Sequence, residues 1–269
     1  MSTPYSADLT LMQRAAEKAG RSLARDFGEV ERLQVSRKGP GDFVSAADRK
    51  SEEIIHHELS KGRPDYSFLM EESGAKGNQD AAFRWIIDPL DGTSNFLHGL
   101  PQWCISIALE KRNGPKPEIV AGIIYDPVKD ELFKAERGQG AFMGRKRMRV
   151  SARSNAESAM ICLGAPRNTP EQRALFMKEY TAAMLYTPGL RRMGAAALDL
   201  AYVAAGRFDA FFERNLQPWD LAAGILMVQE AGGFISDMDK DNGYVVDSCN
   251  VLASNQAFFE PLKKLIRSC

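Results

Sequence analysis

The residues best suited to chemistry in this sequence are acids that follow short apolar segments. In the stretch Trp85–Phe96, an apolar run ends in Asp88, and Asp91 follows three residues later, across Pro89. Proline lacks an N–H and fixes its own φ, so the chain leaves the strand sharply and both carboxylates can face one space. Oxygen ligands without histidine or cysteine favour hard cations, Mg²⁺ before Mn²⁺.

The residues that follow Asp91 suit an anion. Gly92 has no Cβ, so a ligand can approach its backbone closely, and Thr93 and Ser94 add hydroxyls and backbone N–H groups. Successive N–H groups at the start of a helical turn bind phosphate. The segment therefore combines ligands for a cation with a cradle for phosphate. Because D-P and D-G are common turn dipeptides, an ordinary Asx turn is the alternative interpretation.

Three further acids support the functional interpretation, although each has a structural alternative. Glu71 follows the apolar segment Ser67–Met70, and the alternative there is a solvated loop. Asp220 precedes an apolar run, where an aspartate also suits a helix N-terminus. Asp48 precedes an amphipathic pattern, where it also suits the first turn of a helix. Neighbouring acids repel one another unless cations neutralise them, so the set predicts a divalent-cation site.

Composition argues against several other classes of protein. The 269 residues carry 35 Lys and Arg against 35 Asp and Glu, whereas a dedicated nucleic-acid binder usually has a basic excess. No apolar run approaches the roughly 18 residues needed to cross a bilayer, and the first residues lack the pattern of a secretory signal. The four cysteines form no C-x-x-C pair, and three histidines offer little to zinc. We expect a cytoplasmic protein with free thiols and no membrane partner.

The elements that must position these acids fall into two patterns. Periodicity predicts helices over 7–26 and 46–61, strands over 33–36, 67–70 and 83–87, a polar loop over 73–82, and antiparallel strands over 103–111, 118–125 and 131–136. From about residue 150 it predicts helices over 171–184, 195–205, 219–231 and 256–266, alternating with strands over 208–213, 233–236 and 251–254. Strands followed by such alternation favour an α/β protein with two sheets and helices layered between them.

We expect one domain over 1–269, with an α+β lobe over about 1–150 and an α/β lobe over about 151–269. Gly28 suits a helix stop after the first predicted helix. The loop Lys38–Asp42 contains Gly-Pro-Gly, so Lys38 is a candidate residue of a lid that closes over the site.

The motifs taken together resemble the inositol monophosphatase family. The matching segments stand in the family's order and at about its spacing: Met70–Ser73, Trp85–Phe96, Trp219–Gly224 and Glu230–Gly233. The resemblance spans nearly the whole chain, and Met70 stands where the family commonly has glycine. It implies a five-layer αβαβα sandwich of the sugar phosphatase type, a homodimer, and Mg²⁺-dependent hydrolysis of phosphate monoesters that Li⁺ inhibits.

The resemblance also implies a set of metal ligands. By motif position, Glu71, Asp88 and the carbonyl of Leu90 resemble the ligands of a first Mg²⁺. Asp88, Asp91 and Asp220 resemble those of a second, and Glu71 also touches a third, weaker ion in this scheme. Two cations can hold both the attacking and the leaving oxygen of an in-line displacement.

The remaining catalytic roles come from the same resemblance. Asp48 and Thr93 resemble the pair that activates the attacking water, beside Glu71. The amides of Gly92 and Thr93, with Ser94 next to them, resemble the phosphate cradle. We expect direct attack by an activated water, without a phosphoenzyme.

The substrate side rests on fewer residues. Glu213 resembles an acid that accepts hydrogen bonds from ring hydroxyls, and its alternative is a solvated acid at a strand end. The turn of Gly194, Ala195 and Ala196 resembles the substrate-side turn of the inositol phosphatases, and Asp91 is a further substrate-binding candidate. We expect inositol 1-phosphate as the best substrate. Histidinol phosphate, phosphoadenosine phosphate and fructose bisphosphate stay open, because the metal motifs do not separate them.

A non-catalytic role is the second class of function. Some bacterial relatives act as RNA-processing or transcription-complex factors with dispensable phosphatase activity. The segment Arg145–Arg149, together with Arg153, Arg191 and Arg192, is a candidate basic surface for such a partner. A short basic loop is more often a solvated turn, so this interpretation ranks second.

Overall fold

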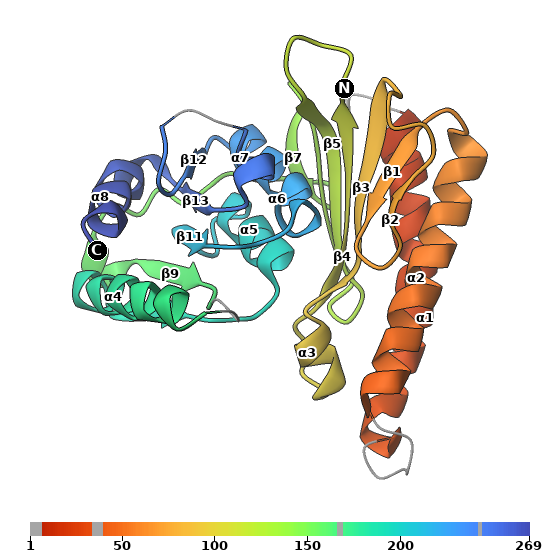
Figure 1. Ribbon diagram of the computed structural model, residues 1–269. Coiled ribbons are helices and arrows are strands. Elements are labelled where there is room, and N and C mark those ends of the chain that lie inside the picture. The colour runs from red at the N-terminus through yellow and green to blue at the C-terminus, as the bar shows by residue number, and fades with distance from the viewer. Residues whose placement is uncertain (1–6, 34–39, 166–168, 242–243) are drawn as a thin grey trace.

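The computed structural model describes residues 7–33, 40–165, 169–241 and 244–269. Over this part of the chain, helices and sheets alternate in five layers (Figure 1). The order across the molecule is helices α1 and α2, an eight-stranded sheet, helices α5 and α6, a five-stranded sheet, and helices α4 and α8. The predicted α/β fold class with αβαβα layering is therefore confirmed.

Two long helices cover the outer face of the larger sheet. They are α1 (Ala7–Leu33) and α2 (Pro40–Gly62). Met12, Ala16 and Leu23 recur at helical spacing on α1 and are fully buried in one apolar cluster with Trp85 and Ile107 of the sheet. This cluster packs the two helices onto the face of the larger sheet that points away from the smaller sheet.

The larger sheet carries the strands that end at the acidic motifs. Its strands are β1 (Ser67–Met70), β2 (Gly74–Lys76), β3 (Phe83–Asp91), β4 (Cys104–Lys111), β5 (Glu118–Asp126), β6 (Glu131–Glu136), β7 (Gly140–Met143) and β8 (Lys146–Arg147). Their spatial order is β2-β1-β3-β4-β5-β6-β7-β8. Only the β1–β3 pair among them is parallel in the described residues, so the carboxyl ends of β1 and β3 lie at one edge of the sheet.

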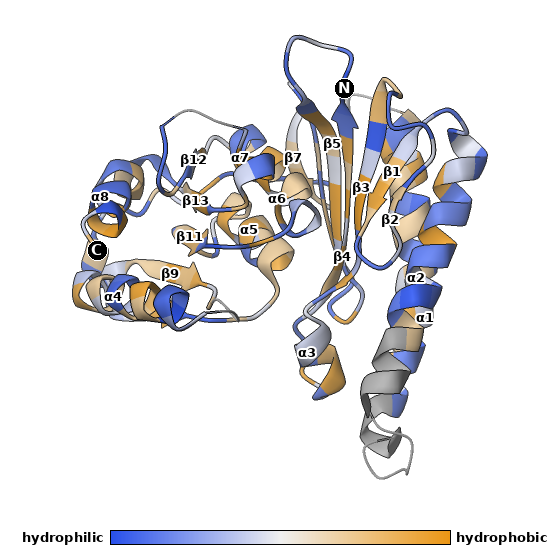
Figure 2. Ribbon diagram, in the orientation of Figure 1, coloured by the Kyte–Doolittle hydropathy of each residue, from blue (hydrophilic) through white to orange (hydrophobic). Residues whose placement is uncertain are grey.

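Two apolar helices fill the space between the sheets. They are α5 (Ala196–Ala204) and α6 (Pro218–Glu230). Every residue of α5 is buried, as is each residue from Leu221 to Val228, because both helices have a sheet on either side (Figure 2). Small residues permit this packing: a Cβ at Gly122 of β5 would lie only 3.0 Å from the Cα of Ala223.

The smaller sheet and its outer helices complete the sandwich. The strands are β9 (Met160–Leu163), β10 (Gly189–Arg191), β11 (Ala210–Glu213), β12 (Phe234–Asp237) and β13 (Val251–Ser254), in the order β10-β9-β11-β13-β12. The outer helices are α4 (Pro170–Tyr186) and α8 (Gln256–Arg267). Three short elements remain: α3 (Thr93–Leu97), α7 (Val245–Ser248) and a 3₁₀ turn (Ala156–Ser158).

Several predicted boundaries were wrong. Helix α1 passes through Gly28 and ends at Leu33, and α2 starts at Pro40 because proline suits the first helical turn. Leu33, the first position of the predicted strand 33–36, belongs to α1. Residues 34–36 and the candidate lid residue Lys38 lie outside the described residues. The predicted loop 73–82 contains β2, a short polar strand that pairs with β1. No helix in the described part of the chain is both long and apolar enough to cross a bilayer.

Candidate active site

A bulge at the end of β3 turns two carboxylates to one side. The pairing with β4 moves from Asp88 opposite Ser106 to Asp91 opposite Cys104, so β3 has one residue more than its partner. Pro89 explains the break, since it has no N–H to give to the ladder. The N–H of Leu90 donates instead to Asp88 Oδ1 at 2.9 Å, which fixes that side chain.

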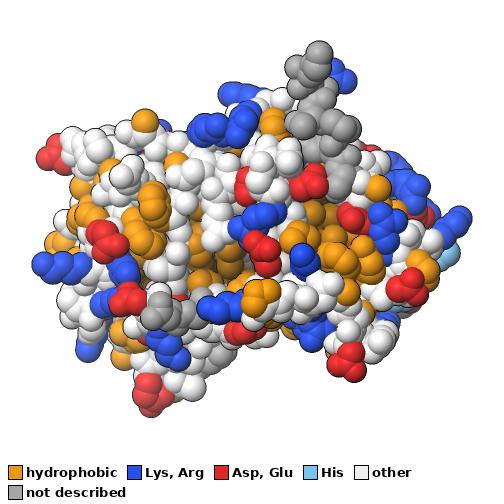
Figure 3. Space-filling view, turned by 90° about the horizontal axis from the view of Figure 1, so that it is seen from above, with side chains coloured by type: hydrophobic (Ala, Val, Ile, Leu, Met, Phe, Trp, Pro, Cys, Tyr) orange, Lys and Arg blue, Asp and Glu red, His pale blue; other side chains and the backbone are white. Residues whose placement is uncertain are grey.

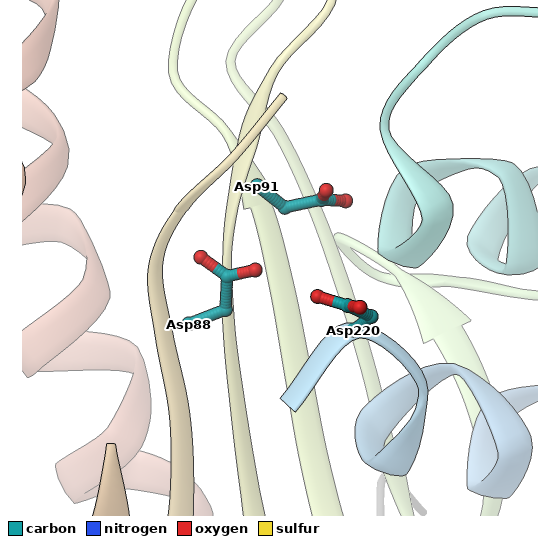
Figure 4. A group of neighbouring side chains, drawn as sticks. All are labelled: Asp88, Asp91 and Asp220. Atoms are coloured by element: carbon teal, nitrogen blue, oxygen red, sulfur yellow. The ribbon is translucent and has the colours of Figure 1, made fainter. Parts of the chain in front are cut away.

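A third carboxylate comes from the first turn of α6. Asp220 Oδ2 accepts a hydrogen bond from the N–H of Gln217 at 2.7 Å, so Asp220 takes part in the cap of this helix. Asp88, Asp91 and Asp220 nevertheless each offer an oxygen to one point, and these oxygens lie within 4.8 Å of one another. Their side chains point toward one another (Figure 4). The capping role of Asp220 is therefore compatible with a role as a metal ligand.

These acids are costly to ionise in the metal-free protein. Burial, together with the charges of Glu71 and Asp91, raises the pKa of Asp88 well above its usual range. Burial and the charge of Asp220 raise the pKa of Asp91 to about 8. A divalent cation would compensate this crowding of negative charge, and the oxygen-only donor set suits Mg²⁺ or Mn²⁺. The residues thus fit a hard divalent metal.

Glu71 and Asp48 extend the acidic cluster toward α2. Glu71 follows β1, lies at an exposed edge, and shares a hydrogen bond with Asp88. Asp48 is 5% exposed on α2, and its Oδ1 has no hydrogen-bond partner in the described residues. Burial and the charges of Glu72 and Glu71 raise the pKa of Asp48 to about 8. A buried oxygen of this kind is ready to accept a proton or a hydrogen bond from a ligand.

The position after Asp91 requires glycine. Gly92 has φ +92°, and a Cβ there would lie 2.8 Å from Gln102 O and 3.2 Å from Ala195 Cβ. Ala195 is itself buried, so it supports this turn from behind. Asp91 Oδ2 accepts the N–H of Ala197 at 2.8 Å, which draws the start of α5 to the same turn.

The two hydroxyl residues of the turn differ in their surroundings. Thr93 Oγ1 donates to the carbonyl of Leu90 at 3.1 Å, so its proton points at that carbonyl and not at Asp48. Ser94 is exposed, and its carbonyl lies 2.8 Å from Nδ1 of His98. His98 therefore closes the short helix α3.

A cavity of about 320 Å³ opens in front of the carboxylates. A model of the inositol monophosphatase family matches residues 6–268, almost the entire chain. The chain belongs to the inositol monophosphatase family. The resemblance inferred from the motifs is confirmed.

Individual relatives agree with this membership over full length. The chain is 53% identical over 262 residues to the inositol-1-monophosphatase of Mesorhizobium japonicum, covering 97% of each chain. It is 40% identical over 266 residues to the Nus factor SuhB of Xylella fastidiosa, covering 97% of this chain and 94% of that one. The crystal structure of extragenic suppressor protein suhB from Bartonella henselae is similar with a TM-score of 0.88 and 52% identity, covering 97% and 99%.

Most of the site residues expected in a member of this family line the cavity. They are Glu71, Asp88, Leu90, Asp91, Gly92, Thr93, Gly194, Ala196, Glu213 and Asp220. Asp48, Ser94 and Ala195 do not line it: Asp48 is buried near Glu72 and Glu71, Ser94 is exposed, and Ala195 is buried. Lys38 lies outside the described residues.

Sequence reasoning missed several lining residues. They are Gly164, Ala165, Arg214, Asn215, Leu216, Gln217 and Trp219. Gly164 follows β9, a strand that the periodicity did not predict, and a Cβ there would collide with the Glu213 carboxylate. The signal that could have found it is the glycine directly after the apolar run Met160–Leu163.

Proposed function

We propose that this chain hydrolyses inositol 1-phosphate to inositol and phosphate, with Mg²⁺ as cofactor. The observation that carries the proposal is the convergence of Asp88, Asp91 and Asp220 beside the Gly92 turn in one cavity. Carboxylates for cations and a close-approach turn for phosphate are what hydrolysis of a phosphate monoester requires. The relative named inositol-1-monophosphatase, at 53% identity, supports the choice of substrate.

The proposed metal ligands form two groups, one for each of two ions. Glu71, Asp88 and the Leu90 carbonyl would hold one ion, and Asp91 and Asp220 would join Asp88 around a second. Bound Mg²⁺ would polarise the phosphoryl oxygens and lower the pKa of a water molecule. We propose two or three ions, with Mn²⁺ as a substitute.

The remaining residues of the chain would orient the reactants. Asp48 Oδ1, unpartnered in the described residues, would take a proton from the attacking water through the Thr93 hydroxyl. For this transfer, Thr93 must rotate away from the Leu90 carbonyl. The Gly92 turn would hold the phosphate, and Glu213 would accept hydrogen bonds from the polyol.

The direct test is phosphate release from a panel of monoesters with Mg²⁺ and with EDTA. We expect Mg²⁺-dependent release that is fastest from inositol 1-phosphate, ahead of histidinol phosphate, fructose 1,6-bisphosphate and phosphoadenosine phosphate. A strong preference for another member would retain the mechanism and reject the polyol assignment. No release from any of them, with metal bound, would reject the enzymatic function.

Substitution of Gly164 by alanine should impair polyol recognition. The new Cβ would occupy the space of the Glu213 carboxylate, so that side chain must rotate away from its place in the cavity wall. Because only a flexible side chain is displaced, the fold should persist. We expect kcat/KM for inositol 1-phosphate to fall about tenfold, the scale of one lost hydrogen bond to a substrate hydroxyl. Glu213→Gln should also lower kcat/KM for inositol 1-phosphate. Gly138→Ala, at an open turn, is unsuitable as a control because Gly138 has a positive φ.

Gly28, an exposed position that tolerates alanine, is a better control for Gly164→Ala. Gly28 lies within α1 with nothing within 4 Å of a Cβ added there, so Gly28→Ala should leave both activity and specificity unchanged. Unaltered kinetics of Gly164→Ala would show that Glu213 does not act from the position seen here.

A second candidate function is a non-catalytic role in a transcription complex. It is favoured by the 40% identity to a protein named Nus factor SuhB and by the exposed residues Arg145, Lys146 and Arg147 around β8. Lys and Arg side chains are interspersed with Asp and Glu on the face shown in Figure 3, which offers no broad basic field there. Salt-dependent RNA binding that survives Asp88→Asn would support this role.

Further properties are proposed from family membership. We propose a cytoplasmic homodimer that Li⁺ inhibits, in which residues 1–150 and 151–269 are two lobes of one domain. Support for a single domain comes from α5 and α6, which pack between both sheets.

A further inference from the structure

One side chain near the cavity joins two loops that are far apart in the sequence. Asn95, in α3, donates from Nδ2 to Gln102 O at 2.7 Å and to Met193 O at 2.9 Å. Asn95 and Met193 are 98 positions apart. The two hydrogens of one amide group are therefore shared between the loop after α3 and the segment that leads into α5.

A second bond fixes the other end of that segment. The N–H of Ala197 donates to Asp91 Oδ2 at 2.8 Å. Between these two ties the packing is close, since a Cβ at Gly92 would lie 3.2 Å from Ala195 Cβ. Residues 193–197 are thus held at both ends against residues 91–95.

The two joined segments carry different parts of the candidate site. Residues 91–95 include an acid of the metal cluster and the Gly92 turn, whereas 193–197 include Gly194 and Ala196 of the cavity wall. Gly194 has φ +81°, and a Cβ there would meet Asn95 Nδ2 at 3.4 Å. The position of the cavity wall relative to the phosphate turn therefore depends on the Asn95 amide.

We propose that Asn95 is a positioning residue that sets polyol specificity by holding Gly194 and Ala196 at a fixed place relative to the phosphate turn. This inference rests on the proposed function, because it concerns which alcohol the same site accepts. Asn95 does not line the cavity, so it acts through the segment that it holds.

The chemistry of the bond explains why an amide is needed. The two close partners of Asn95 Nδ2 are carbonyl oxygens, with Gly194 O a longer third at 3.5 Å, so they require two donors on one short side chain. Asn95→Asp keeps the size but places a carboxylate against two carbonyls, which repel it. Asn95→Ala removes the donors and leaves room for water to replace them, since Asn95 is only partly buried.

The experiment compares two substrates in each variant. We would measure kcat/KM for inositol 1-phosphate and for p-nitrophenyl phosphate, whose leaving group has no ring hydroxyls, with Mg²⁺. The ratio of the two values should fall about tenfold in Asn95→Asp and less in Asn95→Ala, because a small displacement of positioning groups has large kinetic effects. A loss of folded enzyme lowers both values equally and leaves the ratio unchanged.

His98→Ala is the matched control, since the His98 side chain bonds within the same short helix, to the carbonyl of Ser94. Its ratio should equal that of the wild type. A ratio within about twofold of the wild type in both Asn95 variants overturns the inference while the proposed function stands. If Asn95→Asp does not fold, the ratio in Asn95→Ala decides. An inactive wild-type protein overturns the proposed function, and the inference with it.

Discussion

Asp88→Asn is expected to reduce Mg²⁺-dependent phosphate release by at least about 10³-fold in kcat/KM. Asp88 lies among the other acids of the cluster, because the charges of Glu71, Asp91 and Asp220 all act on it. An amide in its place retains the size and the acceptor for the N–H of Leu90 but removes the charge that both proposed ions share. Phosphate release at saturating Mg²⁺, together with calorimetric titration of Mg²⁺, measures the two losses.

The same variant should remain folded without metal. Removing one of several mutually repelling carboxylates relieves the cluster, so the metal-free melting temperature should be equal to or higher than that of the wild type. Asp80→Asn is the matched control, because it makes the same change of charge in the exposed loop near β2. Near-wild-type turnover in Asp88→Asn would remove Asp88 from the metal site and with it the proposed mechanism.

The sequence predicted the parts of the site that lie at strand ends. Asp88 and Asp91 are separated by a single proline, so their convergence is a local property of the chain. Glu71 joins them because β1 pairs in parallel with β3, with Met70 opposite Ile87, and parallel neighbours end at one edge. The pattern of an apolar strand followed by an acid therefore predicted most of the acids of this cluster without knowledge of the fold.

Contacts between distant segments had no comparable signal. The Asn95 bond to Met193 depends on how α5 packs against β3, and nothing in either local sequence specifies it. Gly164 was missed because the apolar run Met160–Leu163, which forms β9, is followed by no acid that would have marked its end as part of a site. Helix α1 passes through Gly28 because its apolar face is held by the sheet, so tertiary packing outweighs the low helix propensity of glycine.

The melting temperature of the metal-free protein should fall as the pH rises from about 5 to 8, and Mg²⁺ should reverse this fall. Burial and neighbouring acids raise the pKa of Asp91 and of Asp48 to about 8, against 3.8 for a free aspartate side chain. Between these two values the folded protein holds protons that the unfolded chain has released. Stability from these groups is therefore largest at low pH and is lost as the pH rises toward 8.

Mg²⁺ acts in the opposite direction, because it binds the ionised carboxylates and displaces their protons. Its stabilising effect should be small at pH 5 and exceed about 5 °C at pH 8. Thermal unfolding at both pH values, with EDTA and with Mg²⁺, measures this difference, and Asp88→Asn should reduce the shift caused by Mg²⁺. A metal-free melting temperature that rises over this range, with an equal Mg²⁺ shift at both pH values, would mean that these acids ionise without cost. Their crowding would then no longer be an argument for a bound cation.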